Sequence, residues 1–244
     1  MENLNFLIVT ETGLVRKDNQ DCFFASEKKS VFCVADGVGG GCAGTEASSI
    51  VCEEIEKSLQ EKSDDIRMLI ENGILAANRR IRQYAHEKRY SAMGSTIAVV
   101  AFVGDDARRA EICHVGDSRV YRLKHDKAVR LTDDHTLANR ILNSGEAQWA
   151  ELLKNRKSPL SHILTKAIGA DEQMSPEWKT VDVETGDCFF VCSDGVHDVI
   201  DDEELFKLFI SSNTIEEFSR ALKTEISRCG APDNFTYIII KIGK

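Results

Sequence analysis

The sequence predicts an α+β fold, in which two mainly antiparallel β-sheets are stacked and pairs of helices cover them on the outside. Strand-like runs follow one another like hairpins rather than alternating strictly with helices, which favours this class over a doubly wound parallel sheet. Two runs, residues 97–103 and 189–191, are apolar on both faces, as in sheets that are covered on each side. The helical stretches carry one apolar stripe each, as expected for helices that lie on a sheet.

The first half of the chain contains three predicted strands followed by two predicted helices. Continuous apolar runs predict the strands, and apolar residues that recur every three or four positions predict the helices. Ala47, Val51 and Ile55 form such a stripe in the first helix. The predicted ranges are strands at 5–10, 22–25 and 31–35 and helices at 45–60 and 64–85.

The second half returns to strands and ends with two helices and a strand. A polar, helix-prone region at 135–161 interrupts the run of strands. In the last helix, Ile215, Phe218 and Leu222 recur at helical spacing. The predicted ranges are strands at 95–103, 109–115, 119–123, 128–132, 187–193 and 235–242 and helices at 202–211 and 215–228.

Composition limits the function classes. The chain has 244 residues, only 3 prolines and no low-complexity break, so we expect one domain over residues 1–244 and, by default, a monomer. Its formal net charge of -9 argues against nucleic acid as a partner, because a phosphate backbone requires a basic footprint.

The location is also constrained. The 8 cysteines form no C-x-x-C and no zinc spacing, and most stand inside apolar runs. The first ten residues lack a basic region followed by a long apolar one, so we expect no signal peptide. The longest apolar run, 97–103, is too short to span a bilayer. We therefore expect a cytoplasmic protein with no membrane contact.

Four aspartates stand at the tips of apolar strands. In "VFCVADGVGGG" (31–41) a strand is expected to end on Asp36, and Asp117, Asp194 and Asp233 occupy similar places. One such residue is usually a turn or helix-cap aspartate. Four that converge would repel one another unless protons or cations compensate them, and oxygen donors without Cys or His favour Mg²⁺ or Mn²⁺. The glycines after Asp36 allow close backbone approach, so that the Gly37 carbonyl becomes a further candidate ligand.

Eight motifs in order over nearly the whole chain resemble those of the metal-dependent protein Ser/Thr phosphatases, the PPM or type 2C family, and look most like its compact bacterial members. Any one motif is weak evidence, but eight in sequence are highly specific. They are "TGLVRKDNQD" (12–21), "VADGVGG" (34–40), "MGSTIAVV" (93–100), "HVGDSRVYRL" (114–123), "LTDDHTL" (131–137), "LTKAIGA" (164–170), "FFVCSDGVHD" (189–198) and "PDNFTYIII" (232–240).

The resemblance implies a four-layer α-β-β-α sandwich with a binuclear Mg²⁺ or Mn²⁺ centre, whose activated water hydrolyses phosphoserine or phosphothreonine. It implies that Asp36 bridges the two metals and that the Gly37 carbonyl binds one of them. Asp194 and Asp233 complete the other, and Asp117 with Asp194 holds a third metal. Arg16, four residues before Gln20, matches the arginine that binds the substrate phosphate.

The chain departs from the best-known form of the family at three positions, Gln20, Val38 and His197. Gln20 stands where many members have Glu, which predicts weaker metal binding, while Asp21 remains an outer-shell anchor. Val38 stands where eukaryotic members have a proposed general-acid histidine, and His162 is the candidate that replaces it. We expect a structural role for His135 in "DHT" and a surface position at a helix start for His197.

The resemblance also suggests partners. Residues 137–161 correspond to the family's flap beside the cleft, where substrate choice is expected. Phosphorylated proteins are the implied substrates, and a cognate Ser/Thr kinase is the implied partner.

Two rival interpretations remain open at this stage. "CHVGDSR" (113–119) satisfies the C-x5-R spacing of cysteine-dependent phosphatases, although strand-like segments flank it. A non-catalytic pseudophosphatase that binds phosphoproteins is the other alternative, and the retained aspartates argue against it.

Overall fold

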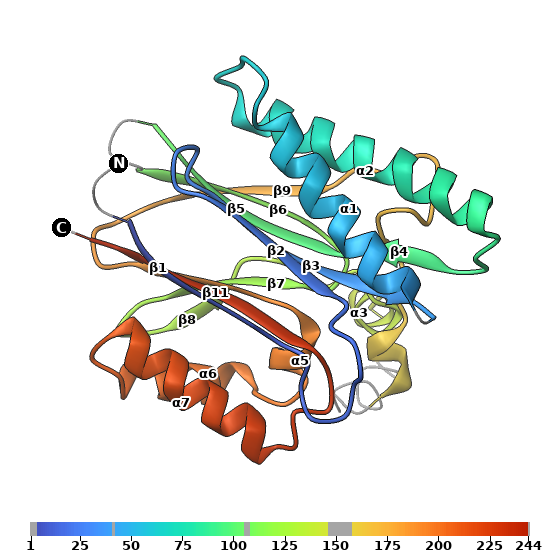
Figure 1. The fold of residues 1–244 in the computed structure, drawn as a ribbon. Coiled ribbons are helices and arrows are strands. Elements are labelled where there is room, and N and C mark those ends of the chain that lie inside the picture. Colours follow the sequence, from blue (N-terminus) through green and yellow to red (C-terminus); the bar gives the residue numbers. More distant parts are fainter. Residues whose placement is uncertain (1–3, 41, 105–107, 146–157, 244) are drawn as a thin grey trace.

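The computed structural model describes residues 4–40, 42–104, 108–145 and 158–243. Two antiparallel sheets stack face to face, and helices cover the outer side of each, so that the predicted α+β sandwich is confirmed (Figure 1). No described helix is long and apolar enough to cross a membrane. The proposed single domain with a flap stays a prediction, since residues 146–157 of the flap lie outside the described part of the chain.

The first sheet pairs the two ends of the chain. β1 and β11 run antiparallel along their whole length, with Leu4 opposite Ile242 and Glu11 opposite Phe235. Its strand order is β1 (Leu4–Glu11), β11 (Phe235–Ile242), β10 (Cys188–Cys192), β7 (Arg119–Leu123) and β8 (Ala128–Arg130).

The second sheet is built around β3. Its order is β2 (Asp21–Ser26), β3 (Val31–Gly39), β5 (Ile97–Val103), β6 (Arg109–Val115) and β9 (Glu177–Asp182), and β4 (Met93–Ser95) pairs with the end of β3. We did not predict β9, because its exposed, partly charged sequence shows no apolar run.

Two helix pairs form the outer layers (Figure 1). α1 (Cys42–Ser58) and α2 (Ile66–Lys88) pack on the second sheet, and α6 (Asp202–Ile210) and α7 (Ile215–Arg228) pack on the first. The short elements α3 (Leu137–Asn143), η2 (Pro159–His162) and α5 (Asp194–His197) complete the described helices. α3 and α5 lie toward the same end of the sandwich, near the end of β3.

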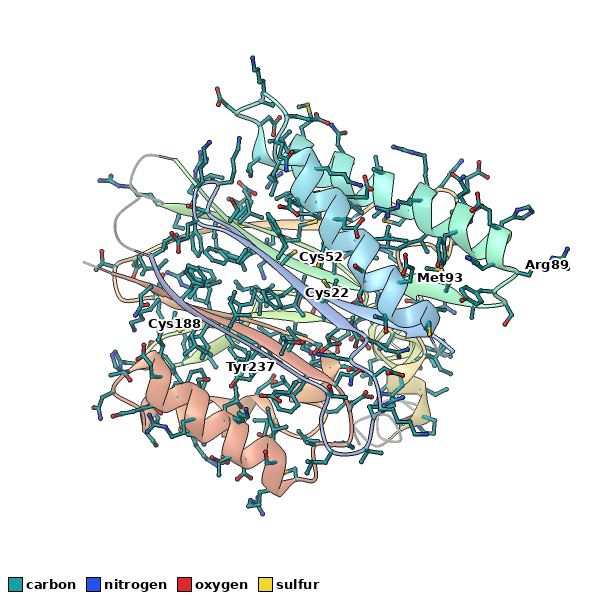
Figure 2. All side chains as sticks on the ribbon, in the orientation of Figure 1. Cys22, Cys52, Arg89, Met93, Cys188 and Tyr237 are labelled. Atoms are coloured by element: carbon teal, nitrogen blue, oxygen red, sulfur yellow. The ribbon has the colours of Figure 1, made fainter. Side chains whose placement is uncertain are left out.

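Three apolar layers hold these elements together. Between the sheets, rings meet edge to face: Phe6 on Phe32 at 5.0 Å between centroids, and Phe102 on Phe189 at 5.2 Å. Cysteine side chains belong to both outer apolar layers. Cys22 and Cys52 lie between α1 and the second sheet, and Cys188 lies between the first sheet and its helices (Figure 2). All eight cysteines are free thiols, as the unpatterned spacing predicted.

The predicted end of β3 at Asp36 is wrong, because the strand continues through it to Gly39. β4 extends the sheet there, with Gly37 opposite Ser95 and Gly39 opposite Met93. The glycines serve this continuation by close packing: a Cβ on Gly37 would stand 1.9 Å from the Gly44 carbonyl oxygen of α1. Only hydrogen fits at that point.

We predict that Gly37→Ala lowers the free energy of unfolding of the metal-free protein by more than about 2 kcal/mol, since backbone must move to admit the methyl group. Gly40→Ala is the matched control, because no atom lies within 4 Å of its added Cβ and its change should stay within about 0.5 kcal/mol. Urea denaturation measures both. Equal stabilities for the two variants would show that the close approach of β3 and α1 is not required.

Candidate active site

The four aspartates singled out in the sequence come from both sheets and lie together. Asp36 is on β3, Asp117 is in the β6–β7 turn, Asp194 opens α5 directly after β10, and Asp233 lies just before β11. Repulsion from Asp194, Asp21 and Asp117 acts on Asp36, and repulsion from Asp233 acts on Asp194. The carboxyl groups of Asp36 and Asp194 are close enough to affect each other's pKa.

Hydroxyl groups couple Asp36 to the turn that carries Asp117. The Asp36 N–H donates to Thr96 Oγ1 at 3.0 Å, and the Thr96 N–H donates to the Asp36 carbonyl at 2.8 Å. Thr96 Oγ1 is also 2.6 Å from Ser118 Oγ, next to Asp117. Adjacent strands of the second sheet therefore fix the spacing between the two aspartates.

Asn234 anchors the loop that carries Arg16. Its amide nitrogen donates to the carbonyl oxygens of Thr12 at 2.8 Å and Asp18 at 2.9 Å, and its Oδ1 accepts the Gln20 N–H at 2.9 Å. Arg16 Nη2 consequently reaches Asp233 Oδ2 at 2.6 Å, although the arginine side chain is half-exposed. A guanidinium group has five N–H donors, so donors remain for a second oxyanion.

The segments that carry Asp194 and Asp233 touch directly. A Cβ on Gly195 would stand 1.9 Å from the Asn234 carbonyl oxygen, so glycine permits this approach. Ser193 Oγ accepts the Thr236 N–H at 3.0 Å and donates to Asp21 Oδ2 at 2.7 Å. Asp21, which lies opposite Asp36 in the β2–β3 register, is thus oriented from the first sheet.

The cluster carries more negative charge than its surroundings compensate. Burial raises the pKa of Asp36 and of Asp117 well above the ordinary value, and Asp194 adds to both shifts. Burial likewise raises the pKa of Asp194, and it raises that of Asp21 to about 7 despite the hydrogen bond from Ser193. Among the described residues, Asp21 Oδ1 is a buried oxygen without a hydrogen-bond partner. An all-oxygen donor set of this charge fits a hard divalent cation.

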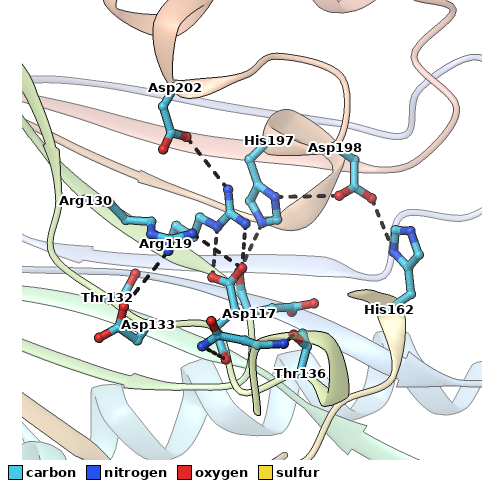
Figure 3. A network of polar contacts seen from close by, with 12 residues as sticks. Asp117, Arg119, Arg130, Thr132, Asp133, Thr136, His162, His197, Asp198 and Asp202 are labelled. Atoms are coloured by element: carbon cyan, nitrogen blue, oxygen red, sulfur yellow. Dashed lines mark hydrogen bonds and ion pairs between the residues drawn. The ribbon is translucent and has the colours of Figure 1, made fainter. Parts of the chain in front are cut away.

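His162 stands at the edge of this cluster. Its Nδ1 is 3.4 Å from Asp198 Oδ2, and ligating atoms of His162, Asp194 and Asp198 all lie within 4.8 Å of one another (Figure 3). Burial and the nearby Asp194 raise the pKa of Asp198 to about 6. We did not single out Asp198 in the sequence, although it ends the "SDGVHD" motif and one helical turn separates it from Asp194.

The predicted surface position of His197 is wrong. The side chain is buried, and its Nε2–H donates to the Asp117 carbonyl oxygen at 3.0 Å (Figure 3). A four-residue helix offers no apolar periodicity from which this inward direction could be predicted. His197 therefore helps to hold the Asp117 turn.

Cys113 does not have the surroundings of a nucleophile. It is buried in β6, which pairs with β5 on one side and β9 on the other, and burial raises its thiol pKa well above the ordinary value. A catalytic thiolate needs a lowered pKa and an open phosphate-binding loop. The C-x5-R interpretation is thus contradicted.

Comparison with known proteins identifies the family. The family model described as protein phosphatase 2C matches residues 10–229. The chain belongs to this family. It is a metal-dependent protein Ser/Thr phosphatase, as the motifs predicted.

Individual relatives of this phosphatase align over nearly its whole length. The serine/threonine phosphatase stp of Listeria innocua is 28% identical over 95% of this chain and 93% of its own. The structure of Stp1 from Staphylococcus aureus superposes with a TM-score of 0.87, 27% identity and coverage of 99% and 96%. The structure of the catalytic domain of PstP in complex with two manganese ions superposes with a TM-score of 0.85, at 25% identity and with 99% of each chain covered.

The raised pKa values predict how pH changes stability in the metal-free phosphatase. The unfolded chain releases the Asp21 proton near pH 3.8 and the folded chain near pH 7, so the folded state binds more protons between them. The Asp21 contribution to the free energy of unfolding therefore falls as pH rises through this window. Replacement of Asp21 by Asn removes it. We expect wild type to lose stability relative to Asp21→Asn between about pH 4 and about pH 7, measured by urea denaturation with chelator.

If the free energy of unfolding changed with pH in the same way in wild type and Asp21→Asn, this prediction would be contradicted. They would mean that the Asp21 carboxyl has an ordinary pKa in the folded protein.

Proposed function

We propose that the aspartate cluster of this phosphatase binds two divalent cations. In this assignment Asp36 would bind both cations, the Gly37 carbonyl would bind one of them, and Asp194 with Asp233 would bind the other. Asp117 and Asp194 hold a third, weaker cation. The observation that carries the proposal is the convergence of mutually repelling carboxyl groups from both sheets, of which Asp117 is buried and Asp36 and Asp194 are half-buried.

The donor set favours Mg²⁺ or Mn²⁺, because every proposed ligand is a carboxylate or carbonyl oxygen. Asp21 and Gln20 act as outer-shell residues. Asp21 Oδ2 is held by Ser193, and the Gln20 side chain lies against Gly44, which in turn packs on the Gly37 carbonyl. The neutral amide of Gln20 carries one negative charge fewer than the glutamate of other members, so we expect weaker metal binding.

The residues around the cluster have distinct roles in the reaction. When bound, the cations supply an activated water and offset the charge of the phosphate. Arg16 binds the substrate phosphate with the guanidinium donors that Asp233 leaves available, and its planar fork suits a phosphate better than lysine would. His162 protonates the departing serine or threonine oxygen, and Asp198, 3.4 Å from its Nδ1, orients the ring. No protein nucleophile is needed, so no phosphoenzyme forms.

Substrates, partner enzyme, oligomeric state and location are proposed only as general classes. Substrates of a protein phosphatase are phosphoproteins, and we propose that residues 137–161 contribute to the choice among them. We also propose a Ser/Thr kinase as the opposing enzyme, a monomeric state and a cytoplasmic location, the last supported by eight free thiols.

The pseudophosphatase alternative has little support. Such modules lose metal-site aspartates, whereas Asp36, Asp117, Asp194 and Asp233 are all present and their segments converge.

The proposal is tested by release of phosphate from a phosphothreonine peptide across a Mn²⁺ titration. Wild type should be active with Mn²⁺ and inactive with chelator. Asp36→Asn and Asp194→Asn should each lose at least about 100-fold in kcat, because each removes a shared charged ligand. Both variants should stay folded, since the lost charges are mutually repelling.

Asp64→Asn, an exposed aspartate in the α1–α2 turn, is the matched control and should match wild type. Substantial activity in Asp36→Asn would refute the bridging role. Inactive wild type at every metal concentration would instead favour the non-catalytic module.

A further inference from the structure

His135 and Gly116 form a reciprocal pair of hydrogen bonds beside Asp117. The His135 backbone N–H donates to the Gly116 carbonyl at 3.0 Å, and the Gly116 N–H donates to His135 Nδ1 at 3.0 Å. Gly116 has φ +98°, where L side chains are strained, and a Cβ there would stand 2.5 Å from Thr96 Cγ2. The turn that presents Asp117 is therefore shaped around one histidine.

The opposite edge of the same ring faces a carboxylate, although among the described residues Nε2 makes no hydrogen bond of standard geometry. His135 Nε2 is 2.9 Å from Glu177 Oε1 on β9, and Lys166 Nζ contacts that oxygen at 2.7 Å. Burial lowers the pKa of His135, and the positive charges of His114 and Lys166 act in the same direction. Because Nδ1 accepts the Gly116 N–H, it carries no proton, and the ring proton resides on Nε2.

This tautomer argues against the simplest alternative, a separate metal site formed by His135 and its neighbours, away from the aspartate cluster. His114, His135 and Glu177 offer ligating atoms within 4.8 Å of one another, and the two rings stack at 4.6 Å between centroids. A metal would need a free lone pair on His135, however, and Nδ1 is engaged by Gly116 while Nε2 carries the proton. With Nδ1 accepting the Gly116 N–H, His135 offers no free lone pair to a cation in this cluster.

His135 also binds the segment that follows His162. Its carbonyl oxygen accepts the Thr165 N–H at 2.7 Å, and the next residue, Thr136, pairs with Leu164. One residue thus contacts the turn before Asp117 and the chain just after η2, and both Asp117 and His162 border the cluster (Figure 3).

We propose that His135 is a positioning residue: through Gly116 and Thr165 it fixes Asp117 relative to His162, and thereby sets the affinity of the Asp117 site for its cation. The inference rests on the proposed role of Asp117 as a metal ligand. Partners of this kind, one step removed from a ligand, typically change metal affinity or activity by about 10- to 100-fold.

Two substitutions separate positioning from simple packing. Asparagine places an amide oxygen where Nδ1 stands, so His135→Asn keeps an acceptor for the Gly116 N–H, whereas His135→Leu keeps bulk without one. We expect the Mn²⁺ concentration for half-maximal activity to rise by about 10- to 100-fold in His135→Leu and by about threefold or less in His135→Asn. Amide hydrogen exchange at Gly116 should follow the same order without metal. His125→Gln, in the β7–β8 loop, is the control.

The tautomer gives a readout that needs neither metal nor activity. Long-range ¹H–¹⁵N spectra of the metal-free protein should show His135 with its proton on Nε2 and a bare Nδ1. Glu177→Ala, at a half-exposed position, should weaken the preference of the ring proton for Nε2 without unfolding the protein. If His135→Leu does not fold, Glu177→Ala is the variant used in its place.

A proton on Nδ1, or equal Gly116 exchange in the Asn and Leu variants, would overturn the proposal. If Asp117→Asn requires no more Mn²⁺ than wild type, the proposed third site is wrong. The tautomer and the Gly116 exchange would then still decide whether His135 holds the turn.

Discussion

Mutual repulsion among clustered carboxylates is the constraint on which this structure depends. Two ionised carboxylates about 4 Å apart repel by about 4 kcal/mol at an effective dielectric constant of 20. Asp36, Asp117 and Asp194 all show its effect, since each has a raised pKa to which a neighbouring acid contributes. The sandwich keeps the groups together because the two sheets that carry them are packed on each other through the apolar layer between them.

The fold holds the carboxylates together by fixing the backbone segments that carry them, and not only the side chains. Thr96 joins the Asp36 strand to the Asp117 turn, and Asn234 joins the Asp233 segment to the loop of Arg16. His135 extends the same principle to the far side of the turn. Most of these links are hydrogen bonds to main-chain groups, so the proposed metal ligands are held by the rigid sheets.

Sequence patterns predicted the layers and the acids but not every support. The apolar pattern placed α7 and β11 at their observed bounds, because α7 has one buried face and β11 is a continuous apolar run that is buried on both faces. Periodicity failed at β9, whose outward side chains carry no pattern, and at β3, whose last residues pair with the short strand β4. The surface position predicted for His197 was wrong, and Asp198 was not singled out. A four-residue helix is too short to show an apolar periodicity, so only the folded structure shows where these side chains point. The roles of Asp117 and Arg16 came from family motifs and not from spacing.

The most direct test of the central claim is anomalous diffraction at the manganese edge from crystals grown with Mn²⁺. Two strong peaks bordered by Asp36, Asp194 and Asp233 are predicted, with a weaker third beside Asp117. Crystals that contain Mn²⁺ in solution but show no peak among these carboxylates would contradict the account, because its reaction would then lack the cations that activate water.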